Sequence, residues 1–120
     1  MRISRLILFV SDLPAMVNFY REKLGLVVIS GERTGFVILD GGACQLALHH
    51  LPVGEKVIKP PPREDSYLKL VFYSKTVEAD VAELKNRDVQ MREIVRFGSI
   101  TMCDGIDPEG NVFQISSREF

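Results

Sequence analysis

The sequence predicts an α+β protein made of two tandem βαβββ modules, whose strands form a curved mixed sheet around a pocket. Each half of the 120-residue chain opens with an apolar strand and continues with an amphipathic helix and three short strands. Leu26 and Val89 are equivalent in this pattern and lie about half a chain apart, which indicates internal duplication. Four prolines fall within residues 51–66, so this segment is expected to be a connecting loop. We therefore expect a single domain over residues 1–120, with modules at about 1–50 and 67–120.

The first module is predicted to begin with a strand over residues 3–10. Its apolar run at residues 6–10 is continuous, which is typical of a strand buried on both faces. Ser11 and Asp12 can cap a following helix, and Gly25 can end it. That helix has one apolar stripe, formed by Leu13, Met16, Val17, Tyr20 and Leu24.

Three more strands complete the first module, at residues 26–30, 36–40 and 44–50. The sequence Asp40-Gly41-Gly42 predicts a tight hairpin between the last two. The second module repeats this order, with a strand at 68–73, a helix with Thr76 as its cap, and strands at 91–97, 100–103 and 111–116. The apolar side chains of the second helix are Val77, Val81 and Leu84.

Composition narrows the range of functions. Lys and Arg number 15 against 16 Asp and Glu, a net charge of −1, whereas nucleic-acid-binding domains usually carry a basic excess. Cys44 and Cys103 are too few for a disulfide framework and are expected to be reduced thiols. No apolar run is long enough for a transmembrane helix, so we expect a cytoplasmic protein that binds neither nucleic acid nor membrane.

Two motifs resemble the glyoxalase, bleomycin-resistance and extradiol dioxygenase superfamily, which has the vicinal oxygen chelate fold. The first is the opening strand with Ser11-Asp12-Leu13, followed by Phe19-Tyr20 and Leu24-Gly25-Leu26. The second is Asp107-Pro108-Glu109-Gly110-Asn111 before the last strand. The resemblance covers nearly the whole chain and implies the fold. It does not imply one reaction, because many functions share a fold.

Metal-dependent members of this superfamily carry His, Glu or Gln ligands at four strand positions. The resemblance places these positions on Arg5, Ala47, Lys69 and Gln114 in this sequence. A protonated arginine has no lone pair to donate, alanine has no donor atom, and a protonated lysine repels a cation. One neutral oxygen from Gln114 is too little to hold a transition metal. We therefore expect no metal and no other cofactor at these positions.

The two histidines do not replace the missing ligands. His49 and His50 are adjacent on a predicted strand, so they point to opposite faces of the sheet. His49 shares its face with Gln45 and Ala47 and is expected to point into the pocket. Alternation gives the rest of the pocket face, which comprises Arg5, Ile7, Phe9, Lys69, Val71, Tyr73, Val112, Gln114 and Ser116. The opposite faces are apolar and are expected to contact the helices.

Such a pocket would suit a small anionic or carbonyl-bearing ligand. The forked guanidinium of Arg5 would bind a carboxylate or phosphate with two hydrogen bonds, and Lys69 would contribute a single positive charge. Gln45, His49 and Gln114 would orient the ligand. His49 or Tyr73 is the candidate acid or base if a reaction takes place. In a purely structural alternative, Arg5 and Lys69 pair with acidic residues such as Asp104, Asp107 and Glu109, or extend into solvent.

Three functions are compatible with these observations. The first is a metal-free small-molecule-binding protein of the bleomycin-resistance type, although two cations disfavour a cationic drug. The second is a glyoxalase-like lyase or isomerase, or a dioxygenase-type enzyme, with an atypical metal site. The third is a structural or regulatory protein with no working cavity. The resemblance also implies a homodimer, because superfamily members of this size commonly complete their pockets across two chains.

Overall fold

The computed structural model describes residues 1–31, 35–51 and 66–119. The chain divides into two compact units, Met1–Ile58 and Lys59–Phe120, and each is described by itself. Most of the predicted connecting loop, residues 52–65, lies outside the described residues. Each unit holds one four-stranded mixed sheet and follows the predicted βαβββ order, so the predicted α+β fold class is confirmed. That the two modules make one domain around a common pocket stays a prediction.

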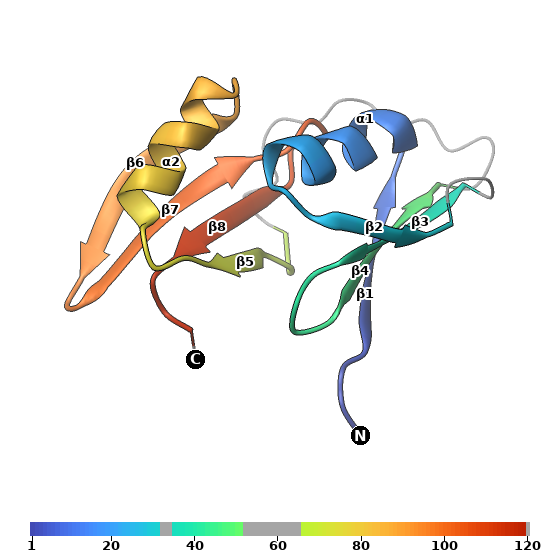
Figure 1. The fold of residues 1–120 in the computed structure, drawn as a ribbon, viewed down its shortest axis with the longest axis horizontal. Coiled ribbons are helices and arrows are strands. Elements are labelled where there is room, and N and C mark those ends of the chain that lie inside the picture. Colours follow the sequence, from blue (N-terminus) through green and yellow to red (C-terminus); the bar gives the residue numbers. More distant parts are fainter. Residues whose placement is uncertain (32–34, 52–65, 120) are drawn as a thin grey trace. The chain divides into compact units, whose positions relative to one another are not determined.

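The first unit has the strand order β1-β4-β3-β2 (Figure 1). Its first and last strands are parallel and the other pairs are antiparallel, as one helical crossover requires. The elements are β1 (Arg5–Val10), α1 (Leu13–Asn18), the π-helical turn η1 (Phe19–Lys23), β2 (Val27–Ser30), β3 (Phe36–Asp40) and β4 (Gln45–His50). All four predicted strands are therefore present: β3 has the predicted bounds, and the other three begin one or two residues later than predicted.

The first helix begins after Asp12 and stops at Gly25, which has φ +76°, as the sequence predicts, but its last turn differs. Asp12 accepts a hydrogen bond from the backbone N–H of Ala15 at 3.1 Å, which caps the helix. The predicted single α-helix widens into the π-turn from Phe19, and the N–H of Leu24 bonds to the carbonyl of Phe19. The apolar stripe in the sequence did not predict this wider turn. In the π-turn the adjacent residues Phe19 and Tyr20 are both buried.

The hairpin between β3 and β4 is confirmed. Asp40 pairs with Gln45 across the strands, and Phe36 pairs with His49 at the other end. The carboxylate of Asp40 accepts a hydrogen bond from the N–H of Gly42 at 2.8 Å. Gly42 has φ +82°, a conformation that glycine adopts at little cost. The turn chemistry in the sequence therefore fixes the register of this part of the sheet.

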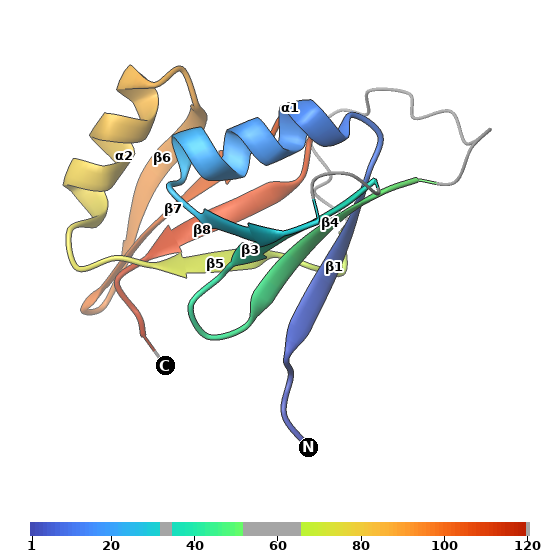
Figure 2. The same cartoon turned by 45° about the vertical axis from the view of Figure 1, so that its right-hand side comes forward.

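The second unit repeats the topology of the first, with the order β5-β8-β7-β6 (Figures 1 and 2). Its elements are β5 (Leu70–Tyr73), α2 (Val77–Asn86), β6 (Gln90–Phe97), β7 (Ile100–Ile106) and β8 (Val112–Ser116). Strand β7 continues three residues beyond the predicted end at Cys103, because Gly105 and Ile106 pair with Phe113 and Val112. The sequence Asp104-Gly105 therefore lies within a strand, although these residue types are common in turns.

The start of α2 departs from the predicted cap. Thr76 occupies the N-cap position, but its side chain makes no capping hydrogen bond. Ser74, which is buried, instead accepts the backbone N–H of Thr76 at 2.9 Å and donates a short hydrogen bond to Asp80. The predicted buried residues of this helix, Val77, Val81 and Leu84, are confirmed.

Each helix covers one face of its own sheet. Helix α1 packs against β4, and α2 packs against β6, β7 and β8. The helix-facing side chains include Leu46, Leu48, Phe113 and Ile115, which are all buried. On the open face of each sheet, Ile7, Phe9, Val71 and Tyr73 are between 44 and 54% exposed. These side chains follow the predicted partition into a helix face and an open face, whereas Ala47, Val112 and Ser116, which were also assigned to the open face, are buried.

None of the helices in the described parts of the chain has both the length and the apolar character needed to cross a membrane.

Candidate functional site

The two basic residues singled out by the sequence occupy equivalent positions in the two units. Ile7 on β1 is the direct partner of Ala47 on β4, and Val71 on β5 is the direct partner of Gln114 on β8. Arg5 precedes Ile7 by two residues, and Lys69 precedes Val71 by two residues. Each basic side chain therefore belongs to the open face of its own sheet, in the same register.

Arg5 is held by Gln45 on the neighbouring strand. Its Nε and Nη2 atoms donate to Oε1 of Gln45 at 2.9 and 2.7 Å, and the two residues are direct partners in the sheet. The guanidinium carbon lies 5.7 Å from the ring centroid of Phe36 on β3. Among the described residues no carboxylate pairs with Arg5, so its positive charge is not compensated by an ion pair there. This arrangement leaves an oriented cation on an open face.

His49 lies on the same face of the first sheet as Arg5 and Gln45. Its ring contacts Phe9 at 5.5 Å and Phe36 at 5.3 Å between centroids, so an aromatic residue from each neighbouring strand packs against it. Within the described ranges its ring nitrogens form no hydrogen bond. His50 is exposed and follows on the strand, as the predicted alternation requires. The first unit therefore brings together three predicted site residues, Arg5, Gln45 and His49.

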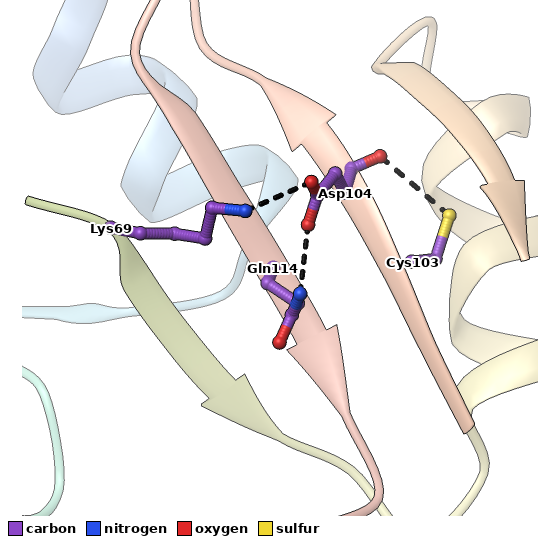
Figure 3. Close-up of polar contacts among 4 residues, drawn as sticks. All are labelled: Lys69, Cys103, Asp104 and Gln114. Carbon is purple, nitrogen blue, oxygen red and sulfur yellow. Dashed lines mark hydrogen bonds and ion pairs between the residues drawn. The ribbon is translucent and has the colours of Figure 1, made fainter. Parts of the chain in front are cut away.

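Lys69 is paired with an acid. Its Nζ lies 3.0 Å from Oδ2 of Asp104, and Nε2 of Gln114 donates to Oδ1 of the same carboxylate at 2.9 Å (Figure 3). Asp104 and Gln114 are direct partners on β7 and β8. For Lys69 the structure therefore has the acidic pairing that the sequence offered as an alternative, and this charge is balanced within its own unit.

The other two acidic residues considered as partners do not fill that role in the described contacts. Asp107 accepts hydrogen bonds from the backbone N–H groups of Glu109 and Asn111, both at 2.9 Å, and from the side chain of Asn111 at 2.8 Å. Both Asp107 and Glu109 are buried. The Asp-Pro-Glu-Gly-Asn sequence is therefore a closed turn before β8, as its turn chemistry predicts.

A hollow of about 350 Å³ opens on the second sheet around this carboxylate. Its size falls at the lower end of the range for small-molecule pockets, roughly 300–1,000 Å³. The hollow lies over β6, β7 and β8 and is lined by Arg92, Glu93, Val95, Met102, Cys103, Asp104 and Gln114. It is formed entirely by residues of the second unit.

Tyr73 ends β5 and is 44% exposed. Its hydroxyl has no hydrogen-bond partner within the described residues. His49, the other candidate acid or base, belongs to the first unit, and the two units are described separately. That either residue acts as an acid or a base stays a prediction.

The residues at the four expected ligand positions do not fit a metal ion. Arg5 and Ala47 offer no lone pair, and the Lys69 ammonium and the Gln114 amide are both bonded to Asp104. Over the described ranges, no group of three or more His, Cys, Asp or Glu side chains is placed to hold a metal. The donor set thus disagrees with the metal chemistry of the metal-dependent superfamily members, and we derive no step through a metal.

Cys103 is one of the residues that line the hollow, and its thiol has the features of an unreactive cysteine. The residue is 1% exposed, and its Sγ donates to the backbone carbonyl of Arg92 at 3.1 Å. Burial raises the pKa of the Cys103 thiol. Figure 3 shows its sulfur directed away from Lys69 and Gln114. A raised pKa and a buried sulfur are the opposite of what a nucleophilic cysteine needs.

Sequence reasoning missed Phe36 as a member of the site. Phe36 contacts both the Arg5 guanidinium and the His49 ring. The position of Phe36 could have been predicted from the sequence, because a hairpin closed by Asp40 and Gln45 puts Phe36 directly opposite His49. Asp104, in contrast, was considered only as one of several possible ion-pair partners.

Comparison with known proteins agrees with this architecture. Residues 2–115 match the family model described as "Glyoxalase/Bleomycin resistance protein/Dioxygenase superfamily". A search of curated proteins finds no match. Among solved structures, the protein SMU.1112c is 25% identical, with a TM-score of 0.78 over 97% of this chain and 98% of that one.

Two other solved structures share the fold but differ in named role. TnmS3, an antibiotic binding protein from Streptomyces sp. CB03234, is 20% identical, with a TM-score of 0.75 over 96% of this chain and 93% of its own. Lactoylglutathione lyase from Agrobacterium tumefaciens is also 20% identical, with a TM-score of 0.74 over 96% and 92%. At this identity the likeness concerns the fold alone.

Proposed function

Because this chain belongs to the Glyoxalase/Bleomycin resistance protein/Dioxygenase superfamily, we propose that it is a metal-free member that binds a small anionic or carbonyl-bearing molecule. One observation carries the proposal: the expected ligand positions hold Arg5, Ala47, Lys69 and Gln114, which bond to other protein groups or lack a donor atom. The fold itself does not decide between binding and catalysis, since one similar structure is a binding protein and another a lyase.

Arg5 supports the preference for an anion. Gln45 is neutral, so its two hydrogen bonds orient the guanidinium without reducing its charge. The remaining N–H groups of Arg5 can donate to a carboxylate or to a carbonyl oxygen. Phe9, Phe36 and His49 add an aromatic wall on the same face, against which the apolar part of a ligand can pack.

Of the other predicted site residues, His49 offers a ring nitrogen to the ligand within the first unit. Lys69 and Gln114 bond to Asp104 within the second unit and take no part in binding the anion. We also propose a homodimer in the cytoplasm. The exposed Ile7, Phe9, Val71 and Tyr73 on the open faces are compatible with a partner chain, since burying such side chains is favourable.

A second candidate function is an enzyme, a glyoxalase-like lyase or isomerase, or a dioxygenase-type enzyme with an atypical metal site. The observation in its favour is the His49 ring, which packs between two phenylalanines while its nitrogens stay without hydrogen bonds from the described residues. In such an enzyme His49 or Tyr73 is the candidate acid or base.

Metal analysis and thermal melting separate these functions. The purified protein is expected to contain no stoichiometric Ni, Zn or Fe, and benzoate is expected to raise its melting temperature. A ligand at about 100 times its dissociation constant adds roughly 2.7 kcal/mol to the free energy of unfolding. Arg5→Ala should abolish the rise, whereas Lys75→Ala, which removes one exposed positive charge elsewhere, should retain it.

Stoichiometric metal retained through purification, and lost together with a lyase or isomerase activity, would instead establish the enzyme. Absence of any anion-dependent rise across carboxylates, sugar phosphates and thiol conjugates would contradict the binding proposal.

A further inference from the structure

The hollow of the second unit has a chemistry different from that of the Arg5 face. We propose that it binds an uncharged, mainly apolar group that carries a carboxamide or a similar donor–acceptor pair, and that Asp104 is the residue that keeps anions out. This inference rests on the proposed function in one respect, the expectation that the chain binds small molecules.

The charges around the hollow balance. Its lining includes one basic residue, Arg92, and two acidic residues, Glu93 and Asp104. Lys69 adds a second positive charge through its ion pair with Asp104. An anion entering the hollow would meet the Asp104 carboxylate, whose side chain is only 22% exposed and therefore poorly screened by solvent. An anion would also have to give up its hydration without gaining an uncompensated cation.

After the bonds to Asp104 are made, the hollow can still offer a ligand one hydrogen-bond donor and one acceptor close to each other. Gln114 uses its Nε2 on Asp104, so its Oε1 stays available to accept a hydrogen bond from a ligand N–H or O–H. Nε2 of Gln114 uses one N–H on Asp104 and has a second one to donate to a ligand carbonyl. Figure 3 shows Oε1 of Gln114 directed away from Asp104. A carboxamide offers the complementary pair of groups, with no net charge.

The walls favour an apolar body for the ligand. Val95 and Met102 are direct partners on β6 and β7, and both line the hollow. Val95 is 53% exposed in the chain, so a ligand that covers it would remove apolar surface from water. Met102 is unbranched and can adjust to ligands of different outline.

Benzamide and benzoate are suitable probes, because they have nearly the same shape and differ in charge. We expect benzamide to shift the side-chain amide signals of Gln114 and the backbone amide signals of β7 and β8 in two-dimensional ¹H–¹⁵N NMR spectra. Benzoate should leave those signals unmoved in the wild-type protein. The variant Asp104→Asn keeps the shape of the side chain and an acceptor for Lys69 or Gln114 while it removes the negative charge.

In Asp104→Asn, benzoate should shift the Gln114 signals at concentrations at least about tenfold below the highest one that leaves them unmoved in the wild type, as removal of one nearby negative charge implies. The affinity for benzamide should change by less than about threefold, since its recognition involves no net charge. Glu93→Gln, which also removes one negative charge from the lining, is the matched control and should not admit benzoate.

Three results would overturn the proposal: benzamide leaves Gln114 unaffected, benzoate binds beside Gln114 in the wild type, or Glu93→Gln admits benzoate as well as Asp104→Asn does. These outcomes are distinct from those of the proposed function. If the benzoate-dependent rise in melting temperature depends on Arg5 while benzamide never reaches Gln114, the proposed function stands and this inference fails. If benzamide shifts Gln114 and no anion binds through Arg5, the anion preference fails and this inference stands.

Discussion

Gly105 and Phe113 are direct partners across β7 and β8, and the phenyl ring of Phe113 occupies the space that a side chain at position 105 would need. A Cβ built on Gly105 would lie 2.6 Å from Sδ of Met91 and 2.9 Å from Cε1 of Phe113, and closer still to Cζ of that ring. Gly105 has no positive φ, so its role is to give room to the buried ring of Phe113 and the half-buried side chain of Met91 rather than to permit a turn. The helix face of the second sheet depends on this gap.

We predict that Gly105→Ala lowers the free energy of unfolding by about 1–3 kcal/mol, the usual cost of overpacking a filled core. Urea denaturation monitored by circular dichroism would measure it. In a Phe113→Leu background, the same substitution should cost less, because the shorter side chain vacates the contested space. Equal costs in the two backgrounds would show that Phe113 is not the obstacle.

The fold was largely predictable because its signals are local and repeated. Asp12 caps a helix, Asp40-Gly41-Gly42 closes a hairpin, and the alternation along β1 and β4 divides an open face from a helix face. The predictions were wrong where packing overrides local propensity. The turn at Phe19–Lys23 is π-helical, with two adjacent aromatic residues buried, and Asp104-Gly105 lies inside a strand because of Phe113.

The candidate site was predictable in its positions but less so in its charges. Alternation placed Arg5, Gln45 and Gln114 on the open faces, whereas the direct pairing of Arg5 with Gln45 was seen only in the structure. Lys69 is paired because Asp104 lies opposite Gln114 on β7. The pairing of β7 with β8 is a tertiary relationship that the sequence pattern does not give. A strand predicted to end at Cys103 gave no reason to prefer Asp104 over other acidic residues as the partner of Lys69.

Cys103 should make stability depend on pH in the alkaline range. Its pKa is raised by burial, so the folded state retains the proton that the unfolded state releases. The contribution is complete below the ordinary thiol pKa and is lost as the pH rises through the raised, folded value. Unfolding free energies measured between neutral and alkaline pH should therefore fall more steeply for the wild type than for Cys103→Ala. Parallel curves for the two proteins would contradict this assignment.

The same burial should protect the Cys103 thiol from reagents. Cys44 is partly exposed, whereas Cys103 is 1% exposed. Under native conditions, Ellman's reagent is expected to label Cys44 much faster than Cys103, and Cys44→Ser should remove the fast phase. Addition of denaturant should make both thiols react at similar rates. Fast native labelling that persists in Cys44→Ser would show that the buried position opens readily.

Glu78 and Arg96 connect the start of α2 to β6 by an ion pair of 2.8 Å. The pKa of Glu78 is lowered, first by its hydrogen bond to a backbone N–H at the helix start and second by the Arg96 side chain. Arg96→Ala should therefore raise this pKa only part of the way to its ordinary value, as followed by NMR titration of the carboxyl carbon. A lowered pKa contributes stability above the ordinary carboxyl pKa, and this contribution is lost as the pH falls through the folded value. Full return of the pKa to its ordinary value in Arg96→Ala would show that the backbone hydrogen bond contributes little.

Gln45→Glu would test whether the uncompensated charge of Arg5 is what selects an anion. The substitution preserves the shape of the side chain and both hydrogen bonds from Arg5, but it converts them into an ion pair. The exposed pair should change the free energy of unfolding by no more than about 1 kcal/mol. Benzoate affinity, measured by calorimetric titration, should fall at least about tenfold, because the added carboxylate offsets the guanidinium charge. Gln45→Ala is the control: it leaves Arg5 charged but no longer oriented, so it should weaken benzoate binding less than Gln45→Glu does. If Gln45→Ala weakens benzoate binding more than Gln45→Glu does, orientation rather than charge controls recognition by Arg5.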